Sequence, residues 1–299
     1  MNIKHFTTGL VVCVLVGAFV IGCTPFQTKV WVEQTDQLSF DAAGLNKLAI
    51  TTYNGPIKVK GETGRNDVHV VVTRKGGGKD EESATAALEA IEVISEASGD
   101  GTHQLGYRWN VEKQYDWQAR VSFEVAMPSR LITNAKSHNG AISIGNVDGE
   151  CDLVTHNGAV TATDVRAVCR IETHNGRISI GSPEATVSAT THNGAITAEC
   201  GGESVNLSSH NGPIKLDATT ATALNGVLTT YNGAIGVVVP TTANAKVTCK
   251  TNNGSIQCDA PWKETKKTRR FASGVLGDGT GQFKAETHNG SIRIQEAKQ

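Results

Sequence analysis

The feature that most constrains the fold of this 299-residue chain is a short motif that recurs at a fixed interval. The motif reads Ser or Thr, then His-Asn-Gly, then any residue and Ile or Val. Its first five glycines are 18 residues apart, at Gly140, Gly158, Gly176, Gly194 and Gly212. Related Asn-Gly copies follow after 21, 21 and 36 residues, the last at Gly290. Such a regular period predicts a repeat architecture in which each unit packs on its neighbours.

Apolar and polar residues alternate in two short runs within each 18-residue unit. With His138 as the first position, positions five and seven are Ile142 and Ile144, and positions fourteen and sixteen are Cys151 and Leu153. Alternation with a period of two predicts β-strands that turn one face inward. The Asn-Gly pair predicts a turn, because Gly, and often Asn, tolerates positive φ.

Two arrangements of these strands are compatible with the turns. Asn-Gly hairpins predict an antiparallel meander, whereas repetition of a whole unit favours coils stacked parallel and in register, about 4.8 Å apart. A left-handed hexapeptide helix also uses 18 residues per coil but needs an aliphatic residue at every sixth position, which the pattern lacks. We therefore predict an all-β chain in which residues 137–299 form a parallel β-solenoid of 18–21-residue coils, with an irregular excursion at 260–284.

Stacked coils place equivalent residues in columns. The asparagines of the motif are expected to form a structural ladder, because stacked amides hydrogen-bond to one another along a β stack. Its members are Asn139, Asn157, Asn175, Asn193, Asn211, Asn232, Asn253 and Asn289. The preceding Thr or Ser column is expected to point inward and the His column outward.

The His column permits two interpretations. A strip of imidazoles about 5 Å apart could bind a metal ion or sense pH. Alternatively, it is a surface position selected for turn geometry and stacking. Tyr231 and Asn252 replace His in the same slot, and no carboxylate recurs beside it to orient the rings. We therefore predict no metal site, and we expect stability to fall near pH 5, where stacked imidazoles would become charged.

Composition excludes several classes of protein. The formal net charge of −1 gives no basic footprint for nucleic acid. Gly is abundant (32 residues) while aromatic residues make up 5%, so the core must consist of thin aliphatic layers. Nucleophile-elbow, P-loop, zinc-protease and dinucleotide-binding motifs are absent from the sequence, and the aspartates of the repeats occupy non-equivalent positions. We predict no catalytic residues and no cofactor.

The N-terminus predicts export and anchoring. Residues 1–22 have a polar start and an apolar run from Leu10 to Ile21, too short to span a bilayer but typical of a signal peptide. The run ends in Val-Ile-Gly-Cys, which resembles the bacterial lipobox and implies cleavage before Cys23 and lipidation of that residue. The alternative is an ordinary signal peptide with a chance cysteine. Residues 23–45 are expected to be a tether, holding the protein to a membrane of the cell envelope, the outer membrane in a diderm.

Residues 46–136 are expected to form a cap section. Lys47–Val59, Val68–Thr73, Gln104–Val111 and Ala119–Met127 have strand character. Asp80–Ser98 predicts one helix, from its Ala, Leu and Glu content and acidic start. This section can cover the first coil and protect its edge. In the excursion at the other end, the basic run Lys263–Arg270 is expected to be a solvated loop, with an anionic polymer or lipid headgroup as the alternative ligand.

Two cysteines share one position of adjacent coils. Cys151 and Cys169 both occupy position fourteen, within the Cα separation that a disulfide allows. A disulfide and a pair of buried thiols that pack as small hydrophobes are both compatible with this placement.

A β-rich start with one helix is followed by the repeated Asn-Gly-x-Ile unit, and over residues 40–297 or so this order resembles the bacterial DUF4097 family. Members of that family are often labelled candidate adhesins and are related to head-GIN domains. The resemblance implies a right-handed β-solenoid at the cell surface or in the periplasm, and provides no active-site residues to carry over.

We expect a non-catalytic adhesion or interaction module whose partner is an envelope glycan, peptidoglycan or a protein, and not nucleic acid. One alternative is a structural or envelope-stress lipoprotein without a specific ligand. A second alternative is a polysaccharide-active β-helix enzyme.

Overall fold

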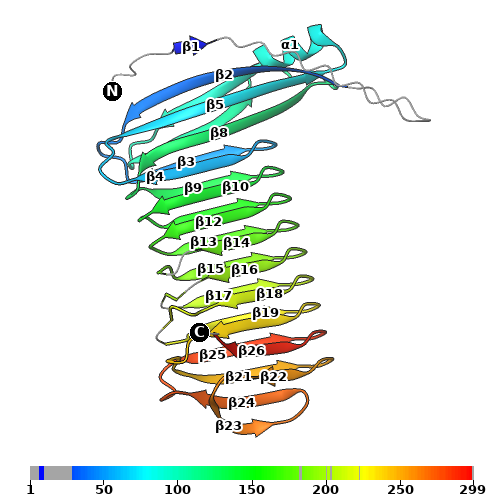
Figure 1. Cartoon of the computed structure of the whole chain (residues 1–299). Coiled ribbons are helices and arrows are strands. Elements are labelled where there is room, and N and C mark those ends of the chain that lie inside the picture. Colours follow the sequence, from blue (N-terminus) through cyan, green and yellow to red (C-terminus); the bar gives the residue numbers. More distant parts are fainter. Residues whose placement is uncertain are drawn as a thin grey trace, which may run out of the picture.

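The computed structural model describes residues 7–9, 29–181, 184–199, 201–202, 204–221 and 223–297. Cys23 and most of the predicted signal peptide lie outside these residues. Nearly all regular structure is β, in two 13-stranded sheets that face each other along an elongated stack (Figure 1). No helix of the described residues is long and apolar enough to cross a bilayer.

The regular coils each contribute one strand to each sheet. Strand β10 (Ile142–Val147) pairs in parallel with β12 (Val160–Val165), and Ile142 lies opposite Val160, its equivalent one repeat later. The parallel, in-register solenoid is therefore confirmed for these coils. The first sheet continues through β14 (Ile178–Gly181), β16 (Ile196–Glu199), β18 (Ile214–Asp217) and β20 (Ile235–Val239). The second contains β9 (Ile132–Ser137), β11 (Cys151–Thr155), β13 (Cys169–Thr173), β15 (Val187–Thr191), β17 (Val205–Ser209) and β19 (Gly226–Thr230).

The core is the narrow space between the two sheets. Strands alternate buried and exposed residues, so that Ile142, Ile144 and Leu153 are buried while their chain neighbours face outward. Phe123 and Phe283 are the buried phenylalanines of the described core, and each lies outside the 18-residue coils. Thin aliphatic layers thus match the low aromatic content of the chain.

The C-terminal coils do not stack in chain order. The last coil, β25 (Gln282–Thr287) and β26 (Ile292–Glu296), lies between the β19–β20 coil and the earlier coil formed by β21 (Ala245–Thr251) and β22 (Ile256–Cys258) (Figure 1). The hairpin of β23 (Trp262–Lys267) and β24 (Phe271–Leu276) pairs antiparallel with β21 and closes the stack.

The expectation of a solvated loop at Lys263–Arg270 is therefore wrong for the part that forms β23. The outer face of this edge strand is exposed and lysine-rich, and charge on an edge discourages pairing with another chain.

The N-terminal section extends both sheets. Long antiparallel strands β2 (Val30–Asp41), β5 (Asp67–Gly78) and β8 (Gln118–Pro128) continue the first sheet, and β7 (Thr102–Trp109) and β6 (Ile91–Ala97) continue the second. Strands β3 (Lys47–Thr52) and β4 (Ile57–Glu62) pair in parallel with β9 and β10, so they already form a coil. The short β1 (Thr7–Gly9) lies antiparallel to β2.

Two predicted boundaries in this section need correction. The tether expected at 23–45 includes β2, because Leu38 and Phe40 pack against the core. The helix expected at Asp80–Ser98 ends early: α1 spans Glu81–Glu89, with Asp80 as N-cap, and β6 follows. The β-branched residues from Ile91 onward pair with β7 instead of extending the helix.

Candidate binding surface along the Asn-Gly corners

Close contact between coils explains the glycine of each corner. A Cβ built on Gly176 would lie 1.7 Å from the carbonyl oxygen of Gly158, and the other glycines of the column show the same approach at 1.8–2.1 Å. None of these corner glycines has positive φ; among the Asn-Gly glycines only Gly226, at the start of β19, does. The turn-conformation argument made from the sequence is therefore wrong at the corners, where glycine is required because the backbones touch.

A buried hydroxyl joins each corner to the one before it. The Thr155 hydroxyl donates to the carbonyl oxygen of Gly140 at 3.0 Å and accepts from the Gly158 N–H at 3.2 Å. Thr173, Thr191 and Ser209 repeat both contacts at 2.9–3.1 Å. The inward orientation expected for this column is confirmed, and its polar groups are satisfied within a buried site.

The asparagine ladder contains all eight predicted residues. From Asn157 on, each side-chain amide donates to the amide oxygen of the asparagine before it in the stack, at 2.6–2.8 Å. The ladder also contains Asn54, which accepts from Asn139 at 2.7 Å. Its sequence signal, Tyr-Asn-Gly-Pro-Ile, predicts a turn but lies outside the 18-residue spacing. In space Asn289 lies between Asn232 and Asn253, as the stacking order of the coils requires.

A continuous column of aromatic rings runs beside the ladder. It begins at Tyr53 and passes through five imidazoles to Tyr231 and His288, with ring centroids 4.5–5.1 Å apart and ring planes within 11° of parallel. The five imidazoles are His138, His156, His174, His192 and His210. Asn252 contacts the Nδ1 atom of His288 at 2.8 Å and ends the column. The rings therefore present their edges, and not their faces, to solvent.

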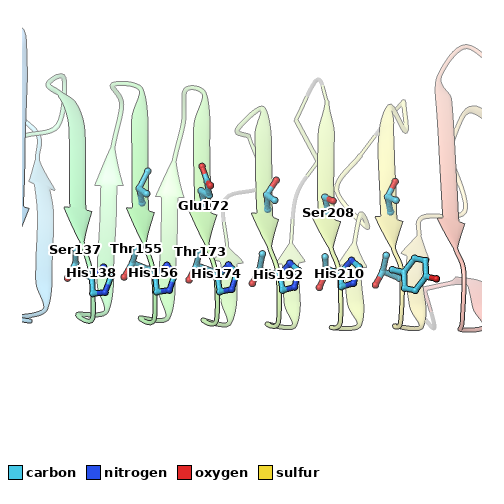
Figure 2. A pocket seen from close by; sticks show the side chains of 17 residues that line it. Ser137, His138, Thr155, His156, Glu172, Thr173, His174, His192, Ser208 and His210 are labelled. Carbon is cyan, nitrogen blue, oxygen red and sulfur yellow. The ribbon is translucent and has the colours of Figure 1, made fainter. Parts of the chain in front are cut away.

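A shallow groove of about 690 Å³ follows this ring column along the second sheet. Figure 2 shows the row of imidazoles with Glu172 and Ser208 on the strands beside them. Hydroxyl side chains dominate the remaining lining, and Glu172 is its single carboxylate. A smaller hollow of about 210 Å³ extends the surface past Tyr231 and brings Lys250 and Glu286 to it. The groove can offer ring edges at the spacing of the coils, together with hydroxyl side chains.

The parallel stacking argues against a metal ion shared by the imidazoles. Imidazole lone pairs lie in the ring plane, so stacked rings direct them side by side and not toward a common centre about 2 Å from each nitrogen. Within the described residues, no group of three or more His, Cys, Asp or Glu side chains is placed to hold a metal ion.

The two cysteines of the predicted pair lie opposite each other on adjacent strands. Cys151 lies opposite Cys169 in the parallel register, and both are buried free thiols. Burial raises the pKa of the Cys169 thiol to about 12 and raises that of Cys151 further, which disfavours the reactive thiolate. Cys200 lies outside the described residues.

These features define a β-solenoid with an extended polar groove along one corner. Residues 34–295 match the family described as Toastrack DUF4097. The chain belongs to this DUF4097 family, as the resemblance of its repeats indicates.

Three solved structures illustrate the similarity. A candidate adhesin from Bacteroides fragilis is 14% identical, with 87% of this chain and 97% of that chain covered and a TM-score of 0.46. A candidate lipid binding protein from Parabacteroides distasonis is 12% identical, with 89% and 97% covered and a TM-score of 0.44. A candidate adhesin from Parabacteroides merdae is 11% identical, with 89% and 96% covered and a TM-score of 0.38. No curated protein matches the chain in sequence.

Proposed function

We propose that this chain is a non-catalytic adhesion module of the bacterial envelope. In this proposal it is lipid-anchored through Cys23 and binds an extended envelope ligand, a glycan strand, peptidoglycan or a protein, along the groove. The observation that carries the proposal is the continuity of the groove, which repeats one ring edge over successive coils and adds the accessible hydroxyls of Thr190, Ser208 and Thr229 on three of them. A repeated surface suits a ligand that itself repeats, because each coil adds an equivalent contact.

The chemistry of the groove favours binding over catalysis. Glycoside hydrolysis needs two carboxyl groups placed across the scissile bond. Among the described residues that line the main groove, Glu172 has the single carboxylate. The hydroxyls of the buried Thr and Ser column are fully engaged by corner backbone groups, so they are not available as nucleophiles.

A pair of matched variants tests the groove. Thr190 is exposed on β15 and lines it, whereas Ser143 is exposed on β10 in the opposite sheet. The Cys23→Ala chain would be immobilised and exposed to separated peptidoglycan, polysaccharide and membrane-protein fractions. We expect saturable binding of one fraction that Thr190→Arg weakens and Ser143→Arg does not. Absence of saturable binding to every fraction would refute the module and favour the structural role without a specific ligand.

The anchor is tested separately. We expect Cys23→Ala to move the protein from the membrane fraction to the soluble fraction, since acylation of the cysteine would be the membrane attachment. Retention of the variant in the membrane fraction would refute the anchor and leave the binding test unaffected.

A further inference from the structure

A second hollow lies at the N-terminal end of the stack. This cleft of about 850 Å³ is formed by the start of β2, the first Asn-Gly corner, the end of β7 and the start of β8. It contains three of the four tryptophans of the chain, Trp31, Trp109 and Trp117. In a protein with so few aromatic residues, this concentration at one open site is the least expected feature of the surface.

The aromatic groups of the cleft differ in burial. Trp31 is 36% exposed at the start of β2, while Trp117 is buried, with 5% of its surface exposed, and packs near Trp109 with ring centroids 5.8 Å apart. The indole N–H of Trp117 is buried without a hydrogen-bond partner. This nitrogen has almost no accessible surface and is not open to a ligand; the more exposed rings that line the cleft are Trp31 and Tyr53.

The charged side chains that line the cleft are all basic. Arg108, Lys113 and Arg120 line it, and no aspartate or glutamate is among the described lining residues. Arg108 is held by Glu92 through two contacts of 2.8 and 2.9 Å. Lys113 and Arg120 are exposed and form no ion pair within the described part of the chain. Two cations are therefore available to a carboxylate of a ligand.

We propose that this cleft binds the acidic sugar of an envelope glycan. Aromatic rings can pack against the C–H face of a pyranose, the exposed Gln118 amide suits its hydroxyls, and the free cations suit a uronate-type carboxylate. The proposal goes beyond the proposed function, because it adds a second binding site to the module. It places the sugar in the cleft, outside the corner groove.

The placement of the tryptophans supplies the assay. Trp262, the remaining tryptophan, is on β23 at the far end of the stack, so fluorescence of a Trp262→Phe protein reports the cleft. The full chain in detergent would be titrated with tetragalacturonate, and with maltotetraose as the neutral probe. We expect saturable quenching by tetragalacturonate that persists in Trp262→Phe and is roughly tenfold weaker in affinity for the Lys113→Gln/Arg120→Gln double variant.

One control variant and three possible results separate this proposal from others. Thr190→Arg, in the corner groove, is expected to leave the affinity for tetragalacturonate unchanged. Equal affinity for maltotetraose, wild-type affinity in the double variant, or absence of saturable quenching would each overturn the acidic-sugar site. If quenching is absent while an envelope fraction still binds in a Thr190-dependent way, the cleft proposal fails and the proposed function stands.

Discussion

Replacement of one corner glycine tests the stacking argument directly. In Gly176→Ala, the new Cβ would lie 1.7 Å from the Gly158 oxygen and 2.6 Å from its carbonyl carbon, where ordinary contact begins at 3.4 Å. Both atoms are backbone, so relief requires separation of two coils. Overpacking of this kind costs about 1–3 kcal/mol or more. Separation also weakens the bond of 3.1 Å from the Thr173 hydroxyl to the Gly158 oxygen and the Asn175–Asn157 bond of 2.6 Å, each contributing about 1 kcal/mol net.

The expected total is a loss of about 3–5 kcal/mol in the free energy of unfolding, or a fall of roughly 10 °C in Tm. Gly236 is the matched control, because a Cβ added there meets nothing within 4 Å and its φ is not positive. Chemical and thermal unfolding followed by circular dichroism would compare Gly176→Ala with Gly236→Ala, for which a change within about 0.5 kcal/mol is expected. Equal stability of the two variants would refute the reasoning that coil contact, and not turn conformation, selects glycine.

Two further predictions concern titratable groups. Burial lowers the pKa of His103 to about 4; the unfolded chain therefore binds this proton first as pH falls from about 6.5. Stability should decline by up to about 3 kcal/mol between these values, and His103→Gln should show a shallower dependence of Tm on pH. A wild-type Tm that is flat or rises from pH 7.5 to 5 would contradict this expectation. Finally, because burial disfavours their thiolates, Cys151 and Cys169 should remain reduced in the exported protein, and a disulfide-linked peptide in non-reducing mapping would contradict this.

The 18-residue period is sufficient to predict most of the solenoid. Strict spacing places like residues on adjacent coils, so the parallel register, the inward Thr column and the ladder from Asn139 follow from the sequence and the geometry of a β-strand. Secondary-structure propensity is less informative where pairing with another strand decides the conformation of a segment. Residues 91–97 follow a helix with good propensity, yet they form a strand because β7 offers a partner.

Tertiary structure alone decides the order of the last coils and the composition of the N-terminal cleft. Asn253 precedes Asn289 in the chain, but the hairpin of β23 and β24 pairs with β21 and leaves room for the final coil on the inner side. Likewise, Trp31 is distant in sequence from Trp109 and Trp117, and the three line one cleft only in the folded chain. The corner can be predicted from the period of the sequence, because each coil repeats the same short-range contacts. The cleft depends on long-range packing of strands that have no period.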